Sequence, residues 1–274
     1  MNRLGTTAVT LAAALSLSAC EADSADMGTG ELAVTIWGEG FVEEGLTAAD
    51  FHDVWAVTFS RYLVAYRDIA ISRGDSTPAV TLPESRVYDL TVKTSGKGQA
   101  VATETVPAGA YDHTAYRIAP PAEGALGPAA EADIETMRTN GWSVWVAGEA
   151  TKGGVTKTFS WGFDIDTQYD PCDSTAVVTD GGAATTQLTV HGEHLFYDDL
   201  VSAEPNVAFD LVAASDTDGD GAITKEELLA RDITAEARYQ VGNEDITNLW
   251  DFIRHQARTI GHIDGEGDCA FAAR

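Results

Sequence analysis

Alternating apolar and polar positions dominate the chain between residues 31 and 200. The period of two is clear in ELAVTIW, residues 31–37, and recurs in later segments that turn residues separate. Successive side chains of a strand point to opposite faces of a sheet, so this period predicts strands with one buried face. The later segments are 55–66, 86–94, 103–109, 113–120 and 187–196. Strands at this spacing are typical of sandwiches and barrels, and we expect a β-sandwich-like domain over residues 31–200.

A hairpin and a helix are expected within this domain. The hairpin covers residues 142–167, where Lys152, Gly153 and Gly154 supply the turn between two alternating runs. The helix covers residues 128–141, because the segment begins after a proline and ends at a glycine.

Aromatic side chains occur on both arms of the hairpin. Alternation places Trp142 and Trp145 on opposite faces of the sheet, with one of them in the core. An exposed row of these rings would make a carbohydrate-binding surface, whereas cross-strand packing explains the same residues without a ligand. The row comprises Trp142, Trp145, Phe159, Trp161 and Phe163.

The period changes to that of helices at about residue 203. The segments 203–215, 225–233 and 243–261 have helical spacing, and the last has an apolar stripe and a cap at Asn243 or Asp245. We therefore expect a mainly β protein whose smaller α part is a helical domain over residues 203–274.

The segment DTDGDGAITKEE, residues 216–227, places five acidic side chains in one short loop between two of these helices. Such a loop repels itself unless it holds a cation, and twelve residues suffice to wrap Ca²⁺ with oxygen ligands. Gly221 stands where the backbone must turn sharply. The expected ligands are the carboxylates of Asp216, Asp218, Asp220 and Glu227, the carbonyl of Ala222, and a water on Thr224.

These positions match the pattern D-x-[DN]-x-[DN]-G-x5-E, so the segment resembles a single EF-hand loop of the extracellular, dockerin-like type. The resemblance implies a Ca²⁺ ion in a mainly structural role. The alternative is an acidic, solvated turn that binds nothing specifically. Residues 264–268 begin like a second loop, but Cys269 stands where the glycine is needed.

The N-terminus reads MNRLGTTAVTLAAALSLSAC and resembles a bacterial lipoprotein signal, with cleavage before Cys20 and lipid on its sulfur. We expect a signal peptide over residues 1–19, a tether over 20–30, and a membrane-anchored protein of the cell envelope, on the periplasmic face or the cell surface. An ordinary signal peptide followed by an incidental cysteine is the alternative.

Cys172 and Cys269 remain after Cys20 is assigned to lipid. Two cysteines outside the cytoplasm most often pair, so a disulfide is expected. Zinc-ligating thiolates are the alternative, but a CxxC spacing is missing.

The formal net charge of −26 argues against nucleic acid and anionic membranes as partners. A protein or polysaccharide partner is not identified. The sequence contains no nucleophile elbow, phosphate loop, HExxH motif or dinucleotide fingerprint, so we expect no enzyme activity.

His191 and His194 stand three residues apart in VHGEHLF. In a straight strand they would face opposite sides, but Gly192 would break the strand and let both imidazoles converge. They are candidate ligands of a zinc or copper site, which would make the protein a transition-metal carrier. The alternative is a pair of hydrogen-bonded histidines at a strand end.

Overall fold

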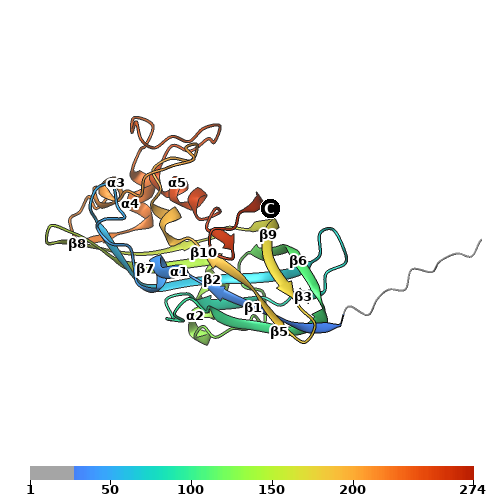
Figure 1. The fold of residues 1–274 in the computed structure, drawn as a ribbon. Coiled ribbons are helices and arrows are strands. Elements are labelled where there is room, and N and C mark those ends of the chain that lie inside the picture. The colour runs from blue at the N-terminus through green and yellow to red at the C-terminus, as the bar shows by residue number, and fades with distance from the viewer. Residues whose placement is uncertain (1–27) are drawn as a thin grey trace, which may run out of the picture.

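The computed structural model describes residues 28–274, and strands predominate over helices in it (Figure 1). The expected signal peptide, most of the tether and the expected lipidation site at Cys20 lie outside the described residues. No helix within residues 28–274 has the length and apolar character needed to cross a membrane.

The first sheet has four strands in the order β12-β10-β1-β5 and is mixed. Its central pair, β1 and β10, is parallel, while β5 and β12 are antiparallel to their neighbours. The bounds are β1 (Thr29–Trp37), β5 (Gln99–Pro107), β10 (Ala183–Val190) and β12 (Gly261–Ile263).

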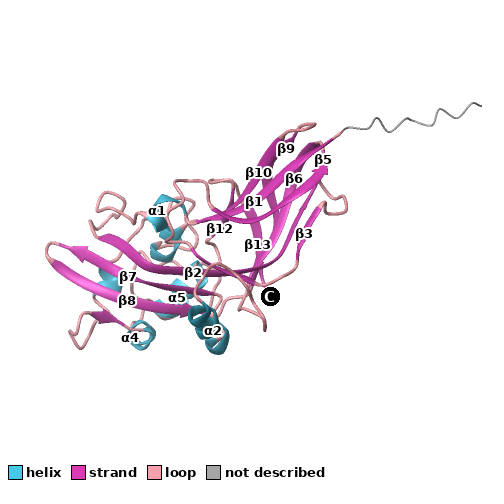
Figure 2. Ribbon diagram, turned by 90° about the horizontal axis from the view of Figure 1, so that it is seen from below, coloured by secondary structure: helices cyan, strands magenta, loops and turns pink. Residues whose placement is uncertain are grey.

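The second sheet has nine strands and is organised around the long strand β2 (Ala56–Ser72). The first half of β2 pairs with β7 and the second half with β6, so β2 runs from one end of the molecule to the other (Figure 2). The remaining bounds are β3 (Val80–Leu82), β4 (Arg86–Asp89), β6 (Gly109–Ile118), β7 (Val144–Lys152), β8 (Val155–Phe163), β9 (Thr167–Val178), β11 (Ala222–Ile223) and β13 (Cys269–Ala273).

The two sheets share one hydrophobic core. Leu32, Val34 and Ile36 alternate along β1 and are completely buried, as the period of two predicts. Residues of the C-terminal segment, such as Phe252 and Ile263, belong to the same cluster of buried side chains. Burial of these side chains ties the last seventy residues to both sheets.

The expectation of a helical C-terminal domain is wrong in its extent, because the helices there are short. They are α3 (Asp210–Ala213), α4 (Lys225–Ala230) and α5 (Leu249–Gln256). Helix α5 begins after Asn248, whose side chain accepts a hydrogen bond from the Asp251 amide, and not at Asn243 or Asp245. The rest of the segment includes β11, β12 and β13, which extend the two sheets. Backbone pairing with existing strand edges therefore prevails over helical periodicity.

Two of the helical elements earlier in the chain are α1 (Glu39–Glu43) and α2 (Glu131–Asn140). Helix α2 lies where the sequence predicts it, and Gly141 ends it in the left-handed conformation with φ of 69°.

The strand expected over residues 187–196 ends at Val190 and continues as the 3₁₀ helix η1 (Gly192–Phe196). Gly192 is required at this change of direction, because a Cβ atom there would lie 2.7 Å from Cγ2 of Val42.

The hairpin of β7 and β8 forms as expected, with Lys152 paired to Val155 across the turn. The expected placement of its tryptophans is wrong: Trp142 precedes β7, and its ring lies 5.6 Å from that of Trp145. Both are half-buried, whereas Phe159, Trp161 and Phe163 lie in the core. The five rings therefore do not form one exposed row.

Candidate functional site

The acidic loop, residues 216–227, brings together three of its expected ligands. One carboxylate oxygen from each of Asp216, Asp218 and Asp220 lies within 4.8 Å of the other two. Gly221 has φ of 87°, a conformation open to glycine and strained for other residues. The backbone therefore turns where the sequence pattern requires it.

Asp216, at the first position of the loop, is held by three donors. Its Oδ1 accepts a hydrogen bond from the Gly219 amide at 2.8 Å, and its Oδ2 accepts one from the Gly221 amide at 3.0 Å. The ammonium of Lys157, on β8, forms an ion pair with Oδ2. The Lys157 ammonium and the two amides lower the pKa of Asp216, so this side chain is a carboxylate at neutral pH.

Glu227, at the last position, joins the two ends of the loop. Its Oε1 accepts a hydrogen bond from the Thr217 amide at 3.0 Å, and its Oε2 accepts from the amide and hydroxyl of Thr224 at 2.9 Å. The Thr224 hydroxyl in turn accepts from the Glu227 amide, which completes a capping box at the start of α4. The Thr224 amide and hydroxyl lower the pKa of Glu227.

Strand β8 anchors the acidic loop to the core. Ala222 and Ile223, which form β11, pair in parallel with Thr158 and Phe159 of β8. The Thr158 amide donates to the Gly221 carbonyl at 2.8 Å. The backbone of the acidic loop thus pairs with a strand of the nine-stranded sheet.

A second group of metal-ligating side chains lies at the ends of the parallel strands β1 and β10. His191 and His194 are joined there by His262, and one ring nitrogen from each lies within 4.8 Å of the others. We call these three residues the histidine cluster. His262 belongs to β12, where it pairs with Thr189 of β10. His262 reaches the cluster only because β12 pairs with β10, and no motif in the nearby sequence indicates this.

The rings of the histidine cluster are packed closely. Those of His191 and His262 are stacked, with centroids 3.8 Å apart and planes 7° apart. The His194 ring stands nearly perpendicular to both, at 5.3 Å and 5.1 Å. His191 is 5% exposed, so the centre of the cluster is shielded from water.

Three glutamates surround His191. Glu39 of α1 places Oε1 3.3 Å from His191 Nε2, and Glu193 of η1 places Oε1 3.5 Å from Nδ1. Glu266, in the turn after β12, groups with Glu39 and His191 within 4.8 Å. The sequence pattern singles out none of these three glutamates as a partner of the histidines, because an acidic chain offers many such residues and only the fold selects among them.

The pKa values of the three histidines in the cluster shift in different directions. Burial, together with the neighbouring imidazoles, lowers the pKa of His194 to about 3 and that of His262 to about 4. Burial also acts to lower the pKa of His191, but the Glu39 and Glu193 carboxylates outweigh it and raise that pKa. Burial raises the pKa of Glu193. His194 and His262 are therefore neutral at pH 7 and present lone pairs.

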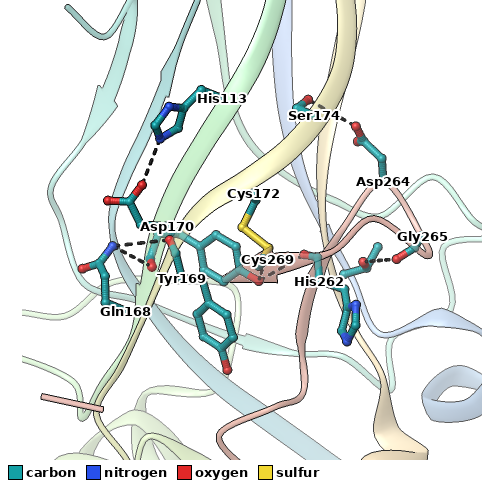
Figure 3. Close-up of a disulfide and its surroundings, with 12 residues drawn as sticks. His113, Gln168, Tyr169, Asp170, Cys172, Ser174, His262, Asp264, Gly265 and Cys269 are labelled. Atoms are coloured by element: carbon teal, nitrogen blue, oxygen red, sulfur yellow. Dashed lines mark hydrogen bonds and ion pairs between the residues drawn. A yellow bond between two sulfur atoms is a disulfide. The ribbon is translucent and has the colours of Figure 1, made fainter. Parts of the chain in front are cut away.

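The expected disulfide joins Cys172 of β9 to Cys269 of β13 and closes a separation of 97 residues (Figure 3). It lies beside the segment that carries His262 and Glu266. Asp264 fastens the same segment, because its carboxylate accepts hydrogen bonds from the amides of Thr175 at 3.0 Å and Gln187 at 2.9 Å. Disulfides are typical of oxidising compartments, which agrees with a place outside the cytoplasm.

Comparison of the chain with protein-family models, with curated proteins and with solved structures found no significant match.

Proposed function

We propose that the protein binds Ca²⁺ in the acidic loop and that the ion has a structural role, fixing the loop and α4 against the β7–β8 hairpin. The observation that carries the proposal is the convergence of Asp216, Asp218 and Asp220 within a loop that matches the twelve-residue calcium pattern at every constrained position. We also propose that the protein is a non-enzymatic component of the cell envelope, anchored through Cys20.

Electrostatics supports this proposal. Five carboxylates within twelve residues repel one another, and Lys157 is a cation that contacts Asp216. A divalent ion would neutralise the remaining negative charge of the loop, and its coordination by the carboxylates would replace their mutual repulsion. The hydrogen bonds of Glu227 to Thr217 and Thr224 fix its carboxylate against the second and ninth positions of the loop.

The attachment of the loop supports a structural role. Ile223 is 1% exposed and its strand pairs with β8, so an ion that orders residues 216–222 also orders the contact between the loop and the sheet. Extracellular calcium modules have dissociation constants of about 10⁻⁴–10⁻³ M. An ion concentration ten times the dissociation constant stabilises the folded state by about 1.4 kcal/mol.

The test is thermal unfolding with and without Ca²⁺, in wild type, Glu227→Gln and Glu226→Gln. Glutamine keeps the capping box with Thr224 but weakens an anionic bidentate ligand, so the helix start is preserved in the first variant. Glu226 is the neighbouring glutamate and lies outside the ligand pattern, so its variant matches the change in charge.

We expect 10 mM Ca²⁺ to raise the Tm of wild type and Glu226→Gln by about 3–6 °C, and that of Glu227→Gln by less than half as much. An unchanged Tm in wild type, together with no Ca²⁺ retained on equilibrium dialysis, would refute the proposal.

A further inference from the structure

The topology of the first sheet explains why the histidine cluster forms. Strands β1 and β10 are parallel, so their carboxyl ends meet at one edge, and Trp37 pairs with Thr189 there. Glu39 follows β1 and His191 follows β10 directly. Strand β12 pairs antiparallel with β10 and adds His262 opposite Thr189. Three segments distant in sequence thus bring imidazoles and carboxylates to one place.

Several polar atoms of this place have no hydrogen-bond partner among residues 28–274. They are Oε2 of Glu193, Nδ1 of His262 and Oε1 of Glu39, and all are buried. Oε1 of Glu39 contacts His191 Nε2 at 3.3 Å as an ion pair and not as a hydrogen bond. Glu193 as a whole is 8% exposed. Buried polar atoms without partners cost free energy, and native proteins satisfy them with water or ions. A cation beside the imidazoles would satisfy carboxylates and nitrogens together.

Hydrogen bonding fixes the tautomer of His194. The Thr259 hydroxyl donates to the Gln256 carbonyl at 2.9 Å, so its oxygen acts as the acceptor toward His194 Nδ1 at 2.9 Å. Nδ1 of His194 therefore carries the proton, and Nε2 has the free lone pair. A histidine whose other nitrogen donates to a neighbouring oxygen is the usual arrangement of a metal ligand.

We propose that His191, His194 and His262, with Glu39 as a carboxylate ligand, form a binding site for a divalent late transition-metal ion of the Zn²⁺ type. Three imidazoles and a carboxylate are a donor set that suits Zn²⁺ or Cu²⁺ and does not suit Ca²⁺, which takes oxygen ligands. The site is separate from the acidic loop and does not depend on calcium binding there.

The stacking of His191 on His262 means that a side chain must rotate before both can bind one ion. The lone pair of an imidazole lies in the plane of its ring, so the parallel rings of His191 and His262 cannot both point at one ion. One of them turns on binding, and His191 ligates the ion through a ring nitrogen that carries no proton. Glu193 and Glu266 then offset the charge of the ion.

The surroundings favour retention of the ion over rapid exchange. His191 is almost completely buried, while His194 borders an open cavity of about 300 Å³ that Tyr197, His255 and Thr259 also line. This cavity gives an ion a route to one side of the cluster. The almost complete burial of His191 suits a retained structural or functional ion better than a carrier that hands metal to partners.

The decisive experiment uses the division of the six histidines into two sets of three. The cluster variant is His191→Ala/His194→Ala/His262→Ala, and the matched control is His52→Ala/His113→Ala/His255→Ala. Both carry Cys20→Ser, which removes the one cysteine outside the disulfide. Zn²⁺ binding is measured by isothermal titration calorimetry against wild type in the same background.

We expect wild type and the control to bind one Zn²⁺ equivalently and the cluster variant to bind it about a hundredfold more weakly or not at all. Failure of wild type to bind Zn²⁺ would overturn the proposal. So would undiminished affinity in the cluster variant.

A second measurement covers the case in which the cluster variant does not fold. In the control variant the cluster histidines are the only imidazoles left, so its Cu²⁺ electron paramagnetic resonance spectrum reports on them alone. Coupling to two or more imidazole nitrogens supports the site, and a spectrum with oxygen ligands only rejects it. Glu227→Gln should bind Zn²⁺ like wild type, which separates this proposal from that for calcium.

Discussion

The indole N–H of Trp161 donates a hydrogen bond to the carbonyl oxygen of Ile223 at a distance of 2.9 Å. Trp161 is 1% exposed and stacks on Phe159, with ring centroids 4.6 Å apart. Ile223 is the eighth residue of the acidic loop. This bond therefore links the loop directly to the aromatic core of the nine-stranded sheet.

Replacing Trp161 by Phe should destabilise the protein by about 2–4 kcal/mol, because the Ile223 carbonyl loses its buried donor and the smaller ring leaves a cavity. Urea unfolding measures the loss. Trp145→Phe is the control, because the indole of the half-buried Trp145 bonds to Oγ of the exposed Ser160, and the loss should stay below about 1 kcal/mol. Equal losses in the two variants would show that the Ile223 bond does not hold the loop.

Replacing Lys157 by Met should strengthen calcium binding. The Lys157 ammonium contacts Asp216 and repels a divalent ion in the loop, so its removal should lower the dissociation constant by about three- to tenfold at low salt. The measurement is a Ca²⁺ titration by calorimetry. Lys152→Met makes the same change in net charge but affects an ion pair with Asp210, outside the loop, and should alter the constant less than twofold. Weaker binding in Lys157→Met would mean that the lysine serves to orient Asp216.

Replacing both Cys172 and Cys269 by Ser should destabilise the protein by about 4–5 kcal/mol in the chain-entropy model, because the disulfide closes a loop of nearly a hundred residues. Urea unfolding of the double variant measures this difference. Wild type kept under reducing conditions should unfold at a similar urea concentration. A loss below about 1 kcal/mol would show that strand pairing alone keeps β13 on β9.

Replacing Arg238 by Met should destabilise the protein by about 1–3 kcal/mol, because Asp198 is 1% exposed and would lose its cation. The Asp198 carboxylate accepts from Arg238 at 2.5 Å and from the Asn206 amide at 2.9 Å. In Asp198→Asn/Arg238→Met the buried charge is gone as well, so urea unfolding should recover part of the loss. An additive loss in the double variant would contradict this account.

Much of the β part of the fold follows from alternation in the sequence. Strand β1, the β7–β8 hairpin and helix α2 lie where the pattern predicts them, because burial of one face and turn residues act locally. The structure of the C-terminal segment cannot be predicted from alternation, because β12 and β13 form only by pairing with the edges of β10 and β9. Three- and five-residue strands have too few side chains to produce a readable period.

The two candidate sites also differ in whether they depend on local sequence or on long-range strand pairing. The acidic loop is readable because all its expected ligands lie within twelve residues. For the histidine cluster, His191 and His194 could be singled out by their spacing, whereas His262 comes from β12 and Glu39 from α1. The proximity of His262 follows from the β10–β12 register, which a single sequence does not reveal.

Strand β1 has a mechanical consequence for any attachment that precedes it. Residues 29–37 are bonded along both edges, to β10 in parallel and to β5 in antiparallel register. A pull transmitted from the N-terminal side loads both ladders in shear, so many hydrogen bonds bear the tension at the same time. Such a strand resists extraction better than an edge strand that peels away one bond after another.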